Sequence, residues 1–233
     1  GLVVCADKRL YNADAATFTD KAVKIRKIDD TALFVATNTV GFYDGRSRTM
    51  AFDAFETAAN YAAKNNIGTG KPFWDGLKKE ITARLREYFA ARKFAEWPES
   101  DRENSNLLFN LIVYTVRDNR AFSHSLRVFY EKKPTPVIYI PDPIREQVRT
   151  PKLSGKGREV MAYLARNPSV AADPLIQRFD ETRFNPQTTT IQNATAFAGK
   201  LFQLTSTGVP KANVSPTFDC ALLDYSTGFK IVM

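Results

Sequence analysis

The pattern of apolar and polar positions predicts strands near the start of the chain. Leu2–Ala6 is an unbroken apolar run, typical of a strand buried on both faces. Residues 11–20 are polar and small, which predicts a loop. From Ala22 to Ile28 apolar and basic residues alternate, which predicts a half-exposed strand. The pair Asp29-Asp30 then predicts a turn, and Ala32–Ala36 a buried strand that completes a hairpin.

Helical spacing of apolar residues appears after this hairpin and again in the last third of the chain. The predicted helices cover Phe52–Ala62, Pro72–Phe89, Gly157–Ala165, Pro174–Phe179 and Thr190–Leu204. Between and after them, strand-like runs occupy Leu107–Val116, Ser125–Tyr130, Val137–Ile140, Phe218–Leu223 and Phe229–Val232. The run Arg117–Arg120 reads as a turn, and Asp224–Gly228 as the turn of a terminal hairpin. This order predicts an α+β protein with antiparallel sheets packed between helix layers.

Composition narrows the class of protein. The chain has 233 residues, of which 44% are hydrophobic and 25% charged, as in ordinary globular proteins of one large or two small domains. No apolar run is long enough for a membrane span, so no membrane role is expected. The net charge is +8, but the basic residues are scattered, which disfavours a dedicated nucleic-acid role.

Cys5 and Cys220 both lie in apolar, strand-like runs. Neither has the Cys-x-x-Cys spacing of a metal or redox site, and two cysteines do not make a disulfide framework, so we expect buried free thiols. We favour a cytoplasmic location, with export open if an upstream signal is removed.

Asp7 and Lys24 are the main candidates for chemistry. Asp7 ends the first predicted strand and Lys24 begins the second. A carboxylate and an ammonium that meet there could form a charged pocket that tunes the pKa of a nucleophile. Ser154 precedes a helix and fits an N-cap better than an active-site hydroxyl, and the single histidine, His124, is expected at the surface.

Four segments together resemble the N-terminal nucleophile (Ntn) hydrolases of the proteasome β-subunit type. They are Gly-Leu-Val-Val-Cys-Ala-Asp-Lys-Arg (Gly1–Arg9), Val-Lys-Ile-Arg-Lys-Ile-Asp-Asp (Val23–Asp30), Ser-Gly-Lys-Gly (Ser154–Gly157) and Val-Ser-Pro-Thr-Phe-Asp-Cys-Ala-Leu-Leu (Val214–Leu223). In that family one strand ends in Ala-Asp-x-Arg, and the next begins with Lys-Ile-x-x-Ile-Asp-Asp.

The resemblance implies a single domain over residues 1–233 that lacks its native first strand. The fold it implies is a four-layer αββα sandwich of two mainly antiparallel sheets between helix layers. Asp7 would fix the catalytic Lys24, which lowers the pKa of the nucleophile, while Ser154 and Ser215 would be supporting hydroxyls. Asn38 would stand where the family has an oxyanion-hole glycine. The substrate would be a peptide or small amide, no cofactor is required, and ring assembly in the family implies a homo-oligomer.

The family nucleophile is an N-terminal residue, usually Thr, whose α-amine acts as the general base. In our alignment that residue falls upstream of Gly1, so the chain as given is expected to be inactive. Asn38 and Ala212, which stands near a supporting Asp of the family, are further departures. Two alternatives therefore stay open: a non-catalytic relative used for assembly or binding, and a basic polyanion-binding protein of another fold.

Overall fold

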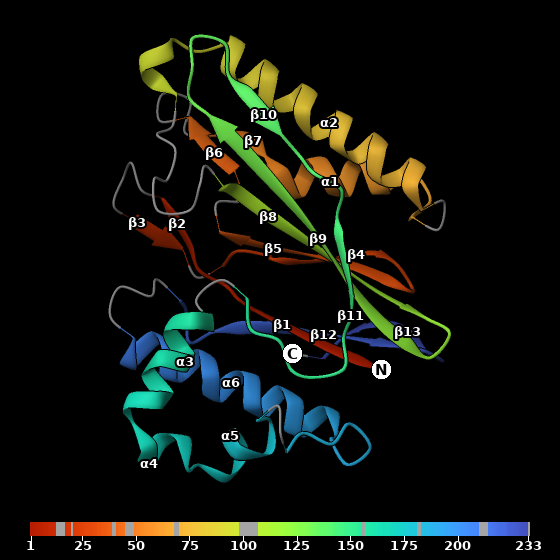
Figure 1. Ribbon diagram of the computed structural model, residues 1–233, viewed down its shortest axis with the longest axis vertical. Coiled ribbons are helices and arrows are strands. Elements are labelled where there is room, and N and C mark those ends of the chain that lie inside the picture. The colour runs from red at the N-terminus through yellow and green to blue at the C-terminus, as the bar shows by residue number, and fades with distance from the viewer. Residues whose placement is uncertain are drawn as a thin grey trace. The chain divides into compact units, whose positions relative to one another are not determined.

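The structure is a computed structural model that describes residues 1–12, 17–19, 21–38, 41–44, 49–67, 70–97, 107–154, 157–180, 183–209 and 214–232 (Figure 1). It mixes helices with several antiparallel sheets, as the predicted α+β class requires. The contacts divide the chain into two compact units. Unit 1 comprises Gly1–Leu33, Thr115–Phe122 and Gln147–Met233, and unit 2 comprises Phe34–Tyr114 and Ser123–Glu146.

The elements of the described chain are bounded as follows. The strands are β1 (Leu2–Asp7), β2 (Leu10–Asn12), β3 (Thr17–Thr19), β4 (Ile25–Asp29), β5 (Ala32–Asn38), β6 (Gly41–Asp44), β7 (Thr49–Asp53), β8 (Leu107–Arg117), β9 (Arg120–Glu131), β10 (Val137–Tyr139), β11 (Ile144–Gln147), β12 (Phe218–Asp224) and β13 (Gly228–Ile231). The helices are α1 (Ala54–Ala62), α2 (Lys71–Ala90), the 3-10 turn η2 (Phe94–Glu96), α3 (Gly157–Arg166), α4 (Pro168–Ala171), α5 (Pro174–Arg178) and α6 (Ile191–Gly208). One sheet has the order β1-β12-β13, a second β10-β9-β8-β5-β4 with β11 on β9, and β2-β3 and β6-β7 form two-stranded sheets.

In unit 1, the first strand pairs with a strand near the end of the chain. β1 and β12 are antiparallel, with a register that runs from Leu2 opposite Leu223 to Asp7 opposite Phe218. The helices α3 to α6 gather on one side of this sheet (Figure 1). Their shared apolar core consists of Val160, Leu164, Ile176 and Leu201. This core holds α6 in place, and α6 in turn contacts both β1 and β12.

The register of β1 and β12 overturns the expectation of free thiols. Cys5 lies directly opposite Cys220, with their Cα atoms 4.1 Å apart, and the two side chains form a disulfide. No free cysteine is present in the described ranges. The expectation was wrong because the cysteines are 215 residues apart in sequence, and only strand pairing brings them together.

In unit 2, α1 packs against α2, and α2 contacts β9 through aromatic side chains. α2 presents a buried face that includes Phe73, Trp74 and Phe89, and the Phe89 ring stacks on Tyr130 of β9 at a centroid distance of 4.7 Å. α1 begins at Ala54, later than predicted, because the Asp53 carboxylate caps it by accepting from the backbone N–H groups of Phe55 and Glu56 at 2.8 and 2.9 Å.

Several short elements depart from the sequence prediction. The predicted loop over residues 11–20 instead contains parts of the small hairpin β2-β3, and the short strand β11, which pairs with β9, was not predicted. Such short strands have too few residues to show a period, and their hydrogen-bonded partners stabilise them. The predicted turn at Arg117–Arg120 is confirmed, with Asp118 and Asn119 both at positive φ (51° and 58°) as a two-residue hairpin turn requires.

His124 differs from its predicted surface setting. Its ring stacks on Trp74, with a centroid distance of 5.1 Å, and is half-buried. Burial, assisted by the positive charge of Arg145, lowers the pKa of His124 to about 4. The neutral imidazole is therefore the form that packs in the folded protein.

This lowered pKa predicts an acid-sensitive stability. The unfolded chain binds a proton at His124 below about pH 6.5, whereas the folded chain does so only below about pH 4. Above about pH 6.5 the ionisation of His124 therefore does not affect the free energy of unfolding, and this free energy decreases as the pH falls towards 4. Between about pH 7 and pH 5, unfolding by urea should show a loss of about 2 kcal/mol. In His124→Gln this loss should be absent. A variant that loses the same stability as the wild type between pH 7 and pH 5 would contradict the assignment.

The packing of α1 on α2 depends on a close approach at Gly76. A Cβ built at Gly76 would overlap the hydroxyl of Tyr61, whose ring also packs on Phe73 at 5.4 Å. Gly76→Ala should therefore destabilise the protein by about 1 kcal/mol, although alanine favours an isolated helix. Thermal unfolding measures this, with Thr82→Ala on the same helix as the control. Adding Tyr61→Phe, which removes the overlapping oxygen, should restore part of the loss; a stabilised Gly76→Ala protein would refute the close approach.

Candidate charged site at the end of the first strand

Asp7 is the last residue of β1, and its carboxylate is the centre of the site. Oδ2 accepts from Lys24 Nζ at 2.9 Å. Oδ1 accepts from the backbone N–H of Arg9 at 2.9 Å and, more weakly, from that of Ser215 at 3.4 Å. These groups come from the end of β1, from the residues before β4 and from the residues before β12, so the carboxylate connects these three stretches of unit 1.

Lys24 reaches Asp7 from the residue immediately before β4. Its segment is brought alongside β1 by a backbone hydrogen bond, in which Ala22 N–H donates to the carbonyl of Lys8 at 3.0 Å. The side chains of Lys24 and Asp7 are each only 17% exposed. Partial exclusion of water strengthens this ion pair relative to a surface pair, and it fixes the position of the ammonium.

Ser215 is fully buried, and its side chain is used within its own loop. The Ser215 hydroxyl pairs with the Thr217 hydroxyl at 2.7 Å and accepts from the Thr217 backbone N–H at 3.1 Å. These bonds shape the residues before β12 so that the Ser215 N–H faces Asp7. The sequence indicated Ser215 but missed Thr217, and it missed that the serine contacts the carboxylate through its backbone.

A second ion pair lies next to the first and joins the residue that follows β1 to β12. Lys8 Nζ lies 3.1 Å from Asp219 Oδ1, with both side chains about a third or less exposed (31% and 26%). The Lys8 backbone N–H also donates to the Thr217 carbonyl at 3.1 Å, which continues the β1-β12 pairing past its last registered pair. Asp7 therefore lies in a fixed stretch of backbone, not in a loose turn.

The other predicted site residues are not drawn into this cluster. Ser154 is exposed and lies three residues before α3, and no contact recorded among the described residues joins it to Asp7 or Lys24. Asn38 ends β5, and its side chain lies outside the described residues, as does the whole of Ala212. The roles of Asn38 and Ser154 stay predictions.

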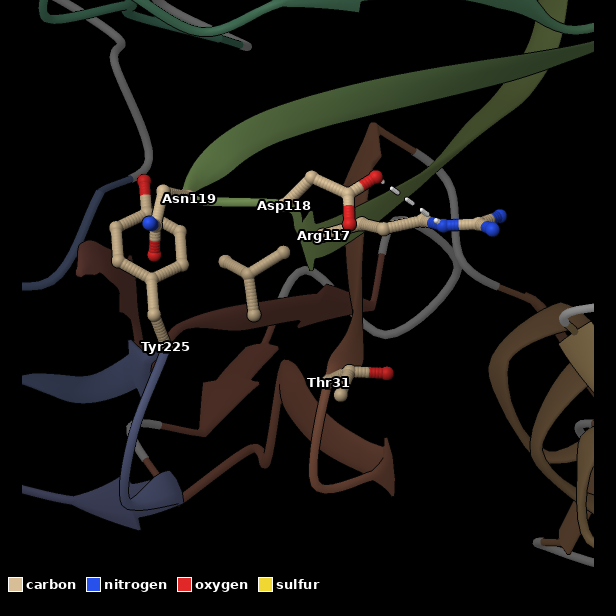
Figure 2. A pocket seen from close by; sticks show the side chains of 6 residues that line it. Thr31, Arg117, Asp118, Asn119 and Tyr225 are labelled. Carbon is tan, nitrogen blue, oxygen red and sulfur yellow. Dashed lines mark ion pairs between the residues drawn. The ribbon is translucent and has the colours of Figure 1, made fainter.

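A pocket of about 290 Å³ lies elsewhere in unit 1. It is lined by Thr31, Val116, Arg117, Asp118, Asn119 and Tyr225. Figure 2 shows the Tyr225 ring beside Asn119, with Arg117 directed away from Tyr225 and paired with Asp118. Neither Asp7 nor Lys24 lines this pocket. We therefore keep the Asp7–Lys24 pair, and not the pocket, as the candidate functional site.

No group of three or more His, Cys, Asp or Glu side chains arranged to hold a metal ion occurs in the described part of the chain. Among the helices of the described ranges, none has both the length and the apolar character needed to cross a bilayer.

The comparisons with known proteins assign no family. No protein-family model matches the chain, and a search of curated proteins found no significant match. The proteasome-like resemblance therefore stays a prediction from the sequence motifs.

The Asp7–Lys24 pair should show a measurable coupling energy. Asp7→Asn leaves the ammonium half-buried without its counter-charge and should cost about 2 kcal/mol in free energy of unfolding. A double-mutant cycle with Lys24→Met isolates the interaction, and we expect a coupling of more than about 1 kcal/mol. The exposed pair Lys71–Asp75 on α2, which is 74% and 38% exposed, is the matched control and should give about 0.4 kcal/mol. Equal coupling in both cycles would show that the Asp7–Lys24 pair behaves as a surface pair.

Proposed function

We propose that the Asp7–Lys24 pair supports an N-terminal nucleophile in an Ntn-type amidohydrolase. The nucleophile would be a Thr, Ser or Cys that processing exposes upstream of Gly1. The observation that carries the proposal is the half-buried ion pair, with Nζ of Lys24 2.9 Å from Oδ2 of Asp7 at the end of β1. This is the pairing that the resemblance of Gly1–Arg9 and Val23–Asp30 to the family implies.

The chemistry would divide between the chain's own groups and the exposed terminus. Asp7 holds Lys24 in place, and the ammonium stabilises the anionic form of a nearby hydroxyl or thiol. The free α-amine removes the proton, because its ordinary pKa of about 8 lies near working pH. The nucleophile attacks the amide carbonyl, the C–N bond breaks, and the α-ammonium returns the proton to the departing amine. Water then hydrolyses the acyl-enzyme and frees the nucleophile.

The backbone around Asp7 supports this role. The Arg9 and Ser215 N–H groups both donate to Oδ1, which leaves Oδ2 for Lys24. The hydroxyls of Ser215 and Thr217 bond to each other, so neither is a free nucleophile. The proposed fold is the four-layer αββα sandwich, with a peptide or a small amide as the substrate.

The test uses the protein with the native residues that precede Gly1. Fluorogenic peptide amides and mass spectrometry of the acyl-enzyme should reveal turnover and the modified residue. Lys24→Ala should lower kcat by about 100-fold or more, because it removes a charge aimed at the nucleophile. Lys71→Ala, which removes a lysine from an exposed ion pair, is the control and should leave kcat unchanged.

Two results would refute the proposal. One is full activity in the Lys24→Ala protein. The other is a native upstream sequence that contains no Thr, Ser or Cys; that result would favour the non-catalytic relative used for assembly or binding.

A further inference from the structure

The disulfide and the candidate site share one face of β1. Successive residues of a strand point to opposite faces, so Cys5 and Asp7 lie on the same face. The burial pattern agrees, because Val4 and Ala6 are buried while Cys5 and Asp7 are half-buried. The covalent link therefore lies two residues from the carboxylate at the centre of the site.

The partner strand β12 also contributes two residues to this face. Cys220 and Phe218 lie directly across from Cys5 and Asp7, so they belong to the same face. The Phe218 ring packs on Phe202 of α6 at 5.0 Å, and a Cβ added at Gly199 of α6 would meet the same ring at 3.1 Å. Helix α6 therefore packs against β12 at Phe218, the residue directly opposite Asp7.

The contact between Asp7 and Ser215 requires one register between β1 and β12. Ser215 and Thr217 lead directly into β12, and the Ser215 N–H reaches Asp7 only while Phe218 stays opposite Asp7. A shift by one residue would turn Asp7 to the other face of the sheet. The disulfide excludes that shift, because its two cysteines are themselves a directly opposed pair.

We propose that the Cys5–Cys220 disulfide is a redox-controlled lock that holds Asp7 in register with Ser215 and Lys24. In the oxidised chain the lock is closed and the site is assembled. In the reduced chain no covalent bond joins β1 to β12; hydrogen bonds, the Lys8–Asp219 ion pair and packing on α6 remain, and the N–H groups that bond to Asp7 open more often.

The reductant belongs to the class of dithiols. Its thiolate attacks the sulfur of half-buried Cys5, because that of Cys220 is fully buried. The S–S bond breaks and the Cys220 thiolate takes up a proton. The second thiol of the reductant then displaces Cys5 as a thiol, and the reductant leaves as its own disulfide. Two electrons and two protons have then passed to the protein.

The structural part of this proposal is independent of the proposed function, whereas its effect on catalysis rests on it. Amide hydrogen exchange tests the structural part without any activity. The backbone N–H groups of Ser215 and Arg9 donate to Asp7 and report directly on its surroundings. Amides of α2 in unit 2 serve as the internal control.

The experiment compares three forms of the full chain: oxidised, reduced by dithiothreitol, and Cys5→Ala/Cys220→Ala. Exchange at Ser215 and Arg9 should be about tenfold faster or more in the last two forms, with exchange in α2 unchanged. Reaction of Lys24 with acetic anhydride, measured by mass spectrometry, should rise in the same two forms. This second reading does not depend on the cysteine variant being stable, because the reduced wild-type chain supplies it.

Unchanged exchange at Ser215 and Arg9 would overturn the proposal. Equal acceleration in α2, or global unfolding on reduction, would also overturn it, because the disulfide would then be a general staple. In the longer, processed protein, amidase activity should fall on reduction. If exchange responds but no activity is found under either condition, the lock stands and the proposed function fails.

Discussion

The antiparallel pairing of β1 with β12 is the constraint on which the described site depends. It joins the first residues of the chain to residues more than 200 positions later, and it places Asp7, Cys5 and Lys8 against the segment from Ser215 to Cys220. The disulfide, the Lys8–Asp219 ion pair and the Ser215 N–H bond to Asp7 all follow from this one register. Packing of Phe218 against α6 holds the same strand from its helix-covered side.

The carboxylate of Asp7 joins three stretches of unit 1 through hydrogen bonds. It receives a charged donor from the segment before β4 and backbone donors from β1's own end and from the loop before β12. These donors hold the half-buried carboxylate in place, and the ion pair keeps the Lys24 ammonium in one position. Such an arrangement suits a supporting role beside a reacting group, which is why we connect it with an N-terminal nucleophile and not with Ser215 or Thr217.

The aromatic packing of unit 2 has a different character. Stacking of His124 on Trp74 and of Tyr130 on Phe89 joins α2 to β9 through apolar contact. The lowered pKa of His124 is a consequence of this packing, so we assign that residue to stability. A shifted pKa can come from structural burial as well as from a functional site. Here the packing of His124 against Trp74 accounts for the shift.

Local sequence patterns determined much of the secondary structure. The apolar run of β1, the spacing of buried residues along α2 and the turn at Asp118-Asn119 are properties of neighbouring residues, so they were predictable. The motifs around Asp7 and Lys24 also identified the two charged side chains that meet.

Only the tertiary structure decided which distant segments lie together. The pairing of Cys5 with Cys220, the backbone bond from Ser215 to Asp7 and the stacking of His124 on Trp74 each join residues far apart in sequence. A single sequence shows which residues prefer a strand or a buried position, but it does not show their partners. Which distant residues come into contact depends on the register of the strands and on packing across the whole unit. Both are set only when the chain folds.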